Sequence, residues 1–217
     1  MKSVRVWFSK QGRAVYISHL DMMRCMQRSL KRAGIPIWYT QGFNPHIYLT
    51  FALPLSLGYS SDCETMDIRL NEDLPYEELV SRLNNALPPN IRVLRAAEPI
   101  NKPEAITYAD YSITIRADDA SLLLGQWSRF IDQPVIASDK KTKKGYKEVN
   151  LKDYIICAEA KTDEASVIIT IRLLAGINEN LNPLLIIEAF RRFCDEVSFQ
   201  AAVRRTAIYD KQLCLFE

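Results

Sequence analysis

The sequence predicts an α+β fold built from two halves that share one order of elements. Alternating apolar and polar residues predict strands, and apolar residues spaced three and four apart predict helices. The order strand, helix, strand, strand, helix, strand occurs once within residues 1–99 and again within residues 110–217. This order is typical of a ferredoxin-like antiparallel sheet with two helices on one face. We therefore expect two tandem ferredoxin-like domains, joined by a linker over residues 100–109.

The first half begins with a strand over residues 4–9, where Val4, Val6 and Phe8 alternate with other residues. A helix over residues 19–33 follows, because Ser18 can cap it and Asp21 places a carboxylate in its first turn. Gly34 is a suitable stop for this helix. Further along, we expect extended segments at residues 35–39, 47–51, 65–70 and 91–94 and a helix over residues 76–87.

The second half follows two prolines, Pro99 and Pro103, which mark the linker. Here the patterns predict strands at residues 111–116, 166–173 and 199–209, helices at residues 121–131 and 183–194, and a lysine-rich loop flanked by extended residues 134–137 and 149–156. The two halves show no residue-level identity, so only the order of elements repeats.

Composition favours a soluble cytoplasmic protein with reduced thiols. The chain has 217 residues, of which 48% are hydrophobic, and this is enough for a sizeable core. It has neither the apolar core of a signal peptide nor an apolar stretch of roughly 20 residues that could span a bilayer. The five cysteines have no spacing suited to zinc or an iron–sulfur cluster, so we expect no metal site. They are Cys25, Cys63, Cys157, Cys194 and Cys214.

Positive charge is concentrated at the start of the chain. The first 55 residues hold eight lysines and arginines against Asp21 alone, a net charge of +7, while the whole chain carries +2. Such a surface attracts phosphate, and arginines spaced four apart on a helix can present a row of guanidinium groups. The residues expected to contact nucleic acid here are Lys10, Arg13, Arg24, Arg28 and Arg32. A solvated helix face without a ligand is the alternative.

A second basic cluster lies late in the chain. Residues 139–152 hold six lysines against Asp139 and Glu148, a net charge of +4. The residues expected to contact nucleic acid here are Lys140, Lys141, Lys143, Lys144, Tyr146 and Lys147. Lysines can follow a phosphate backbone and the tyrosine ring can stack on an unpaired base, although a purely solubilising loop is the alternative. We expect both clusters to face one way, and the acidic residues 62–78 to point away from nucleic acid.

Three residues of the basic third are candidates for acid–base chemistry. His19, Asp21 and His46 could act as acid, base or orienting group in phosphodiester cleavage. The structural alternative is that His19 bonds the helix start, Asp21 caps it, and His46 closes a turn. The turn preceding His46 is expected to be a ligand-positioning loop or a plain connector. Its residues are Gly42, Phe43, Asn44 and Pro45.

Several of these motifs together resemble a bacterial family of radical-SAM-linked proteins, domain of unknown function 2344. The similarity rests on Lys10-Gln11-Gly12, Ser18-His19-Leu20-Asp21 with Arg24, Arg32-Ala33-Gly34, Gly42-Phe43-Asn44-Pro45-His46, Pro54-Leu55 with Gly58, and residues 141–145. The resemblance implies a neighbouring or fused radical S-adenosylmethionine enzyme and assigns no activity. This chain lacks the CxxxCxxC motif of such enzymes, so S-adenosylmethionine and the [4Fe–4S] cluster would belong to the partner, and this chain itself would bind no cofactor.

Three functions remain open. The chain can be an accessory protein that brings RNA to the radical SAM enzyme for modification or processing. It can instead be an enzyme acting on RNA through His19, Asp21 and His46. It can also be a protein-interaction scaffold for the radical SAM partner that binds no RNA.

Overall fold

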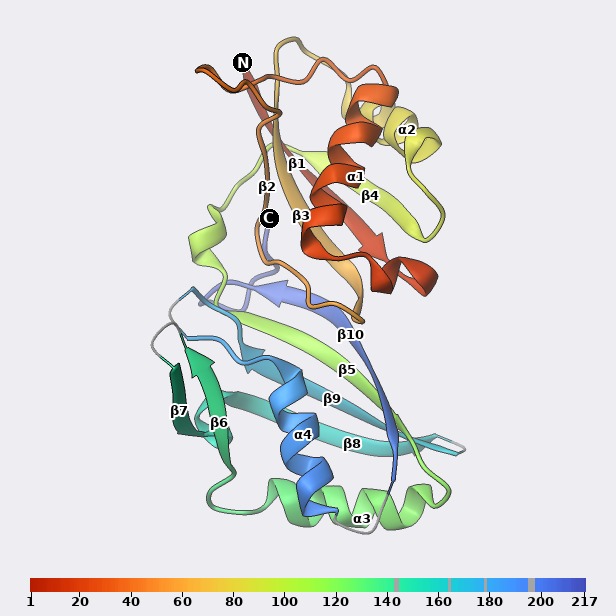
Figure 1. Ribbon diagram of the computed structural model, residues 1–217, viewed down its shortest axis with the longest axis vertical. Coiled ribbons are helices and arrows are strands. Elements are labelled where there is room, and N and C mark those ends of the chain that lie inside the picture. The colour runs from red at the N-terminus through yellow and green to blue at the C-terminus, as the bar shows by residue number, and fades with distance from the viewer. Residues whose placement is uncertain (143–144, 164, 178, 195–197) are drawn as a thin grey trace. The chain divides into compact units, whose positions relative to one another are not determined.

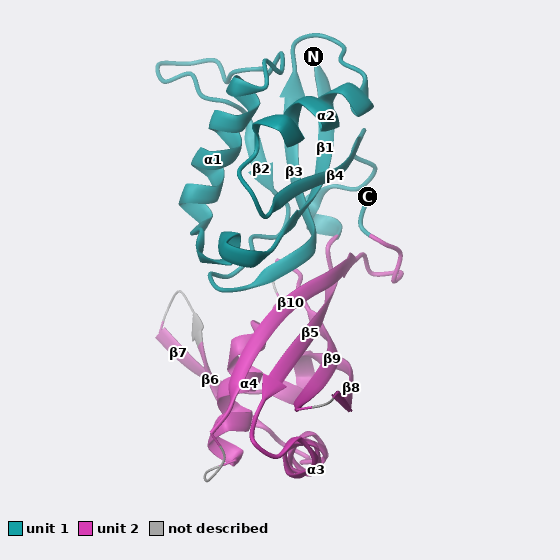
Figure 2. Ribbon diagram, turned by 90° about the vertical axis from the view of Figure 1, so that its right-hand side faces the viewer, with its two compact units in different colours: residues 1–105, 216–217 teal, residues 106–215 magenta. Residues whose placement is uncertain are grey.

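The computed structural model describes residues 1–142, 145–163, 165–177, 179–194 and 198–217 of an α+β chain. The chain forms two compact units (Figure 2). Unit 1 contains Met1–Ala105 with Phe216–Glu217, and unit 2 contains Ile106–Leu215. The division lies inside the expected linker, where the 3-10 helix η2 (Pro103–Ala105) is followed by the first strand of unit 2. The last two residues, expected in the second half, belong to unit 1.

Unit 1 is a four-stranded antiparallel sheet with two helices on one face (Figure 1). Its strands lie in the order β4-β1-β3-β2. Its elements are β1 (Lys2–Lys10), the 3-10 helix η1 (Gly12–Tyr16), α1 (His19–Arg32), β2 (Leu49–Phe51), β3 (Ser60–Leu70), α2 (Tyr76–Ala86) and β4 (Ile91–Ala97).

The core of unit 1 follows the predicted alternation. Val4, Val6 and Phe8 of β1 are buried in one cluster with Met26 and Leu30 of α1. Burying each of these large side chains contributes about 2 kcal/mol relative to leaving it exposed. The inward side of α1 repeats at three- and four-residue spacing, so the helix lies along the sheet with its arginines outside.

Unit 2 repeats this arrangement with one addition. Its strands lie in the order β10-β5-β9-β8 (Figure 1). Helices α3 and α4 pack against one another through the rings of Trp127, Phe130 and Phe190. A separate two-stranded hairpin, β6-β7, precedes β8. The elements are β5 (Tyr108–Arg116), α3 (Ala120–Ile131), β6 (Ala137–Thr142), β7 (Gly145–Asn150), the 3-10 helix η3 (Leu151–Tyr154), β8 (Ile155–Asp163), β9 (Ser166–Leu174), α4 (Pro183–Phe193) and β10 (Gln200–Tyr209).

Each unit has one bidentate arginine–aspartate pair across two neighbouring strands. In unit 1, Arg5 of β1 donates to both carboxylate oxygens of Asp67 on β3, at 2.7 and 2.8 Å. In unit 2, Arg172 of β9 donates to both carboxylate oxygens of Asp110 on β5, at 2.6 and 2.8 Å. Both pairs join residues 62 positions apart, with the two charges exchanged between the strands.

The four predicted helices are confirmed to within one residue at either end, and the extended segments are less accurate. Strand β3 begins five residues before the expected segment 65–70, and three other segments differ in kind or length. Residues 35–39 form only the isolated bridges of Ile37 and Tyr39. The expected lysine-rich loop is instead the hairpin β6-β7. Strand β8 extends to Asp163, beyond the expected segment, because it is a polar edge strand whose outward residues hide the apolar alternation. Among the described residues, no helix is long and apolar enough to cross a bilayer.

Candidate functional site at the start of helix α1

A small pocket lies in unit 1 where the first turn of α1 meets the ends of β1 and β3. Three of its lining residues are ionisable, Lys10, His19 and Glu64, and two of them are deeply buried: Lys10 is 3% exposed and Glu64 is 4% exposed. The other lining residues are Phe8, Ile17, Met22, Phe51, Pro54 and Leu55. Buried charged groups beside a histidine are typical of functional sites, so this pocket is the candidate site.

The two buried charges occupy positions that the strand alternation turns inward. Lys10 follows Val4, Val6 and Phe8 at a spacing of two along β1, and Glu64 precedes Met66 at the same spacing on β3. Successive side chains of a strand point to opposite faces. The core therefore ends, at this end of the sheet, in a lysine and a glutamate instead of apolar residues.

Both residues were expected on the surface from the sequence. Lys10 was expected in the basic surface, but its burial removes it from any contact with a phosphate backbone. Glu64 was expected among the acidic surface residues 62–78. The alternation with Met66, Ile68 and Leu70 was the signal that could have found Glu64.

Lys10 holds the segment that leads into α1. Its Nζ donates to the carbonyls of Ile17 at 3.1 Å and Val15 at 3.4 Å. Gly12 starts the same segment at φ +50, where other residues are strained, and a Cβ there would lie 2.5 Å from Oδ1 of Asn90 and would have to displace that side chain. These contacts position the start of the helix, and His19 with it.

His19 faces the pocket from the first turn of α1. Its ring lies edge-on to Phe51, with centroids 5.5 Å apart. The free volume of about 20 Å³ is close to that of one water molecule. The pocket can therefore hold a water or a single small group beside an imidazole, an ammonium and a carboxylate, but it has no room for a nucleotide.

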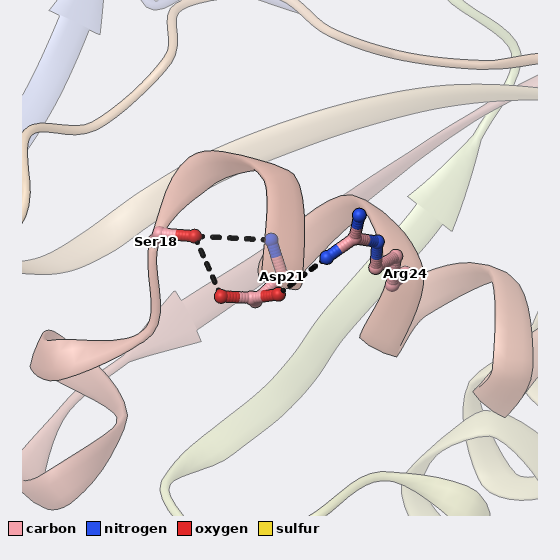
Figure 3. Close-up of polar contacts among 3 residues, drawn as sticks. All are labelled: Ser18, Asp21 and Arg24. Atoms are coloured by element: carbon pink, nitrogen blue, oxygen red, sulfur yellow. Dashed lines mark hydrogen bonds and ion pairs between the residues drawn. The ribbon is translucent and has the colours of Figure 1, made fainter.

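The first turn of α1 carries a small polar network (Figure 3). The Ser18 hydroxyl accepts the Asp21 N–H at 3.2 Å and donates to its carboxylate at 2.8 Å, as Figure 3 shows. Arg24 donates to the other carboxylate oxygen at 3.0 Å. The Ser18 hydroxyl, followed by the Arg24 guanidinium, holds the pKa of Asp21 below its usual range. Ser18 thus caps the helix, and the Asp21 carboxylate accepts from the capping hydroxyl and pairs with Arg24.

The three candidate acid–base residues are not brought together. His19 and Asp21 are two residues apart on a helix, a spacing at which side chains do not face each other. His46 bonds instead within its own turn, where Nδ1 lies 3.0 Å from Thr40 Oγ1 and 3.1 Å from the Asn44 carbonyl. Lys10 and Glu64, not Asp21 and His46, share the pocket with His19.

The turn ahead of His46 presents an aromatic ring to solvent. Phe43 is fully exposed, and its neighbours Gly42, Asn44 and Pro45 are exposed as well. The Thr40 N–H donates to the His46 carbonyl at 2.8 Å and thereby closes the turn. Phe43 is therefore not packed beneath this turn.

The basic residues around α1 have different surroundings. Arg13, Arg24 and Arg28 are exposed, and Arg28 makes no hydrogen bond or ion pair to the residues that the structure describes. Arg32 is used by the fold, because it donates to the carbonyl of Ala86, the last residue of α2. Of the three arginines expected in a row, Arg28 thus has a guanidinium that is unpaired among the described residues, and Arg24 has one that is paired only at the surface.

The basic hairpin is the second place where predicted residues gather. We give this name to β6-β7, in which Lys140 lies opposite Lys147 and Lys141 opposite Tyr146. Tyr146 is 74% exposed and Lys147 is exposed. Lys140 donates to the Asn180 carbonyl and lies 4.6 Å from the Tyr154 ring centre. Of the other predicted residues, Lys143 and Lys144 lie outside the described residues.

Burial affects the chemistry of two residues that could have been reactive. Burial lowers the pKa of Lys140, and the nearby Lys147 lowers it further against the opposing effect of Glu179. Burial raises the pKa of the Cys25 thiol, which lies four residues after Asp21 on α1. Within the described parts of the chain, no group of three or more His, Cys, Asp or Glu residues is arranged to hold a metal ion.

Comparison with known proteins gave one family match. The model of the family described as "Uncharacterized protein conserved in bacteria (DUF2344)" matches residues 3–183. No curated protein matched the chain.

Two solved structures are similar at low sequence identity. An unknown protein from Galdieria sulphuraria is 11% identical, with 94% of this chain and 98% of that chain covered and a TM-score of 0.27. A protein described as "putative glycine cleavage system transcriptional repressor" is 12% identical, with 97% and 98% covered and a TM-score of 0.26. TM-scores this low do not establish a shared fold.

Proposed function

We propose that this chain, which belongs to the bacterial family DUF2344, binds RNA and serves a separate radical SAM enzyme as an accessory protein. In this proposal the radical chemistry, with S-adenosylmethionine and the [4Fe–4S] cluster, belongs to the partner. This chain supplies cationic and aromatic side chains that hold the RNA.

The observation that carries the proposal is the pairing within the basic hairpin. Lys140 and Lys147 lie directly opposite each other on neighbouring strands, where like charges destabilise a ribbon. Exposed Tyr146 adds an aromatic ring one residue away. A two-stranded ribbon is marginally stable by itself, and repulsion between its strands weakens it further. A polyanion would relieve that repulsion, and a base stacked on the tyrosine would add to the binding free energy.

Helix α1 offers further support in unit 1. Exposed Arg24 and Arg28 lie four residues apart on its outer side, and Arg13 precedes them. Guanidinium groups can each make two parallel hydrogen bonds to a phosphate. Between Asp21 and Asp62 the chain has no aspartate or glutamate, so this part of unit 1 has little charge that would repel RNA.

The test is a fluorescence titration of labelled cellular RNA at two ionic strengths. The affinity should fall steeply as salt rises, because binding releases counterions. Lys147→Gln and Tyr146→Ser should each weaken binding roughly 5- to 10-fold. Lys161→Gln, which removes an exposed lysine from strand β8 of the same unit, is the matched control and should bind like the wild type. Absent or salt-insensitive binding would exclude the proposed function.

A protein scaffold is the second candidate, and exposed apolar side chains favour it. Tyr16 and Leu20 are exposed at the start of α1, and Leu57 is exposed on a loop that the Gly58 N–H ties to the Val15 carbonyl at 2.9 Å. Exposed apolar groups of this kind are typical of protein-docking surfaces. Co-purification with the radical SAM enzyme after nuclease treatment, lost in Leu20→Ser, would favour the scaffold over RNA binding.

We also propose that each unit is a ferredoxin-like domain. The support is the strand order, β4-β1-β3-β2 and β10-β5-β9-β8, together with two helices between the strands of each unit. In this interpretation the basic hairpin is an insertion ahead of the second strand of the second domain.

A further inference from the structure

Three residues of unit 1, outside the pocket and the basic hairpin, form a compact cluster of two rings and a guanidinium. We call Trp38, Tyr48 and Arg69 the arginine–aromatic cluster. The Arg69 guanidinium lies 4.1 Å from the Tyr48 ring centre and 5.4 Å from that of Trp38, and the two rings meet edge-on with centroids 6.2 Å apart. Backbone hydrogen bonds hold the segments together, since the Trp38 N–H donates to the Arg69 carbonyl at 2.7 Å.

Arg69 differs from the other stacked arginines in having no acceptor. Five arginines of the described residues lie over an aromatic ring. Arg5, Arg95 and Arg172 also pair with carboxylates, and Arg191 donates to a backbone carbonyl. The guanidinium of Arg69 makes no hydrogen bond or ion pair within the described part of the chain. The flat face of the guanidinium stacks on the rings, while its N–H groups have no acceptor among the described residues.

The nearby carboxylate that could pair with Arg69 already pairs with another arginine. Asp67 lies two residues earlier on the same face of β3, and both of its oxygens accept from Arg5. All three residues of the cluster are partly exposed, so a ligand can reach them. An open guanidinium held flat against rings is suited to bind a phosphate in two parallel hydrogen bonds.

The surroundings of the cluster favour an anionic, aromatic ligand. The turn closed by Thr40 and His46 lies between Trp38 and Tyr48 in the chain and presents the fully exposed Phe43. Lys31 lies 5.6 Å from the ring centre of the neighbouring Tyr39. Exposed rings beside cations are the combination with which proteins bind single-stranded nucleic acid.

We propose that the arginine–aromatic cluster binds one unpaired nucleotide of an RNA strand. Arg69 holds the phosphate, and the exposed part of the Trp38 ring stacks on the base. This inference rests on the proposed function, RNA binding, and adds both the class of RNA and a second contact site. Bases paired inside a duplex cannot reach the rings, so the cluster selects single-stranded segments.

The test compares a fluorescein-labelled oligouridine of about ten nucleotides with an RNA hairpin of similar length by anisotropy. Arg69→Gln and Trp38→Leu should each weaken the binding of oligouridine about tenfold, and they should weaken the binding of the RNA hairpin much less. Arg69→Gln should also reduce the slope of log affinity against log salt by about one. Arg92→Gln removes an exposed arginine from β4 of the same unit and should bind within about twofold of the wild type.

Tryptophan fluorescence gives a readout that a structural role would not change. Trp7 and Trp127 are buried, so quenching by unlabelled oligouridine should report Trp38, and Trp38→Phe should abolish it while keeping most of the affinity. Arg69→Lys guards against a folding defect, because it keeps the charge and should keep the salt slope while losing affinity several-fold.

The outcomes separate the two proposals. If the wild type binds oligouridine but Arg69→Gln matches Arg92→Gln, or if binding leaves the tryptophan fluorescence unchanged, the cluster is not a nucleotide site and the proposed function stands. If the wild type binds neither RNA at either salt concentration, the proposed function fails and the cluster inference fails with it.

Discussion

Lys10 and Glu64 illustrate at the scale of single residues what composition cannot tell. Both were counted as surface charges, yet both stand where the alternation of β1 and β3 turns side chains inward. The charge of a side chain by itself predicts a position on the surface. The register of the strand, however, decides which face of the sheet the residue occupies. The pocket was therefore predictable in part: His19 was found from its chemistry, and its two buried neighbours could be found only from the alternation.

Lys10→Met should destabilise the protein by about 2 kcal/mol. The variant keeps the volume of the side chain but removes the donor of the Ile17 carbonyl, and it leaves the Val15 carbonyl with only the Gly58 N–H. Urea unfolding followed by circular dichroism would measure the loss. Arg13→Gln, in the exposed neighbouring turn, should unfold like the wild type. Equal stability of Lys10→Met and wild type would mean that these hydrogen bonds do not hold the helix start.

At the scale of elements, helix ends were the easiest features to predict. Ser18 caps α1 through the Asp21 N–H, and Asp119 and Asn182 cap α3 and α4 in the same way. These signals are local, so the sequence contains them fully. The edges of the sheets were harder, because residues 35–39 and β8 depend on which strand lies beside them.

The Asp21 carboxylate, which accepts a hydrogen bond from the capping residue Ser18, should make the stability of the protein depend on pH. The folded pKa of Asp21 lies below the ordinary 3.8, so its contribution is fully present above that value and is lost as pH falls through the folded pKa. Asp21→Asn should be less stable than the wild type near neutral pH, and the difference should shrink as pH falls below about 4. Denaturant unfolding of both proteins across this range checks the prediction. A difference that stays constant with pH would contradict it.

At the scale of the whole molecule, the order of elements was visible in the sequence and the pairing of charges was not. The repeat of strand order in the two units follows from the alternating and helical patterns. The pairs Arg5–Asp67 and Asp110–Arg172 each join residues 62 positions apart, and no local pattern links residues so far apart. Because the charges are exchanged between the units, a search for identical residues also misses the correspondence.

The contributions of Asp110 and Arg172 to the stability of unit 2 should be coupled. Asp110 accepts from Arg172 and also from the Tyr209 hydroxyl at 3.1 Å, and the pair is largely buried. Asp110→Ala and Arg172→Met should each destabilise by about 3 kcal/mol, since each leaves a buried charge unpaired. The double variant should lose clearly less than the sum. Additive losses in a thermal or denaturant double-mutant cycle would show that the pair is not coupled.

The two units also differ from each other at the same position in their order of elements, the connection between the first helix and the second strand of the main sheet. In unit 1 this connection carries the turn with Phe43, and in unit 2 it carries the hairpin with Tyr146. The tips of both connections, which carry Phe43 and Tyr146, add no strand to the main sheet of their unit, so their sequence can change without altering the pairing of its strands. Under the proposed function, substitutions confined to these two connections would therefore change the ligand preference of each unit and leave its fold intact.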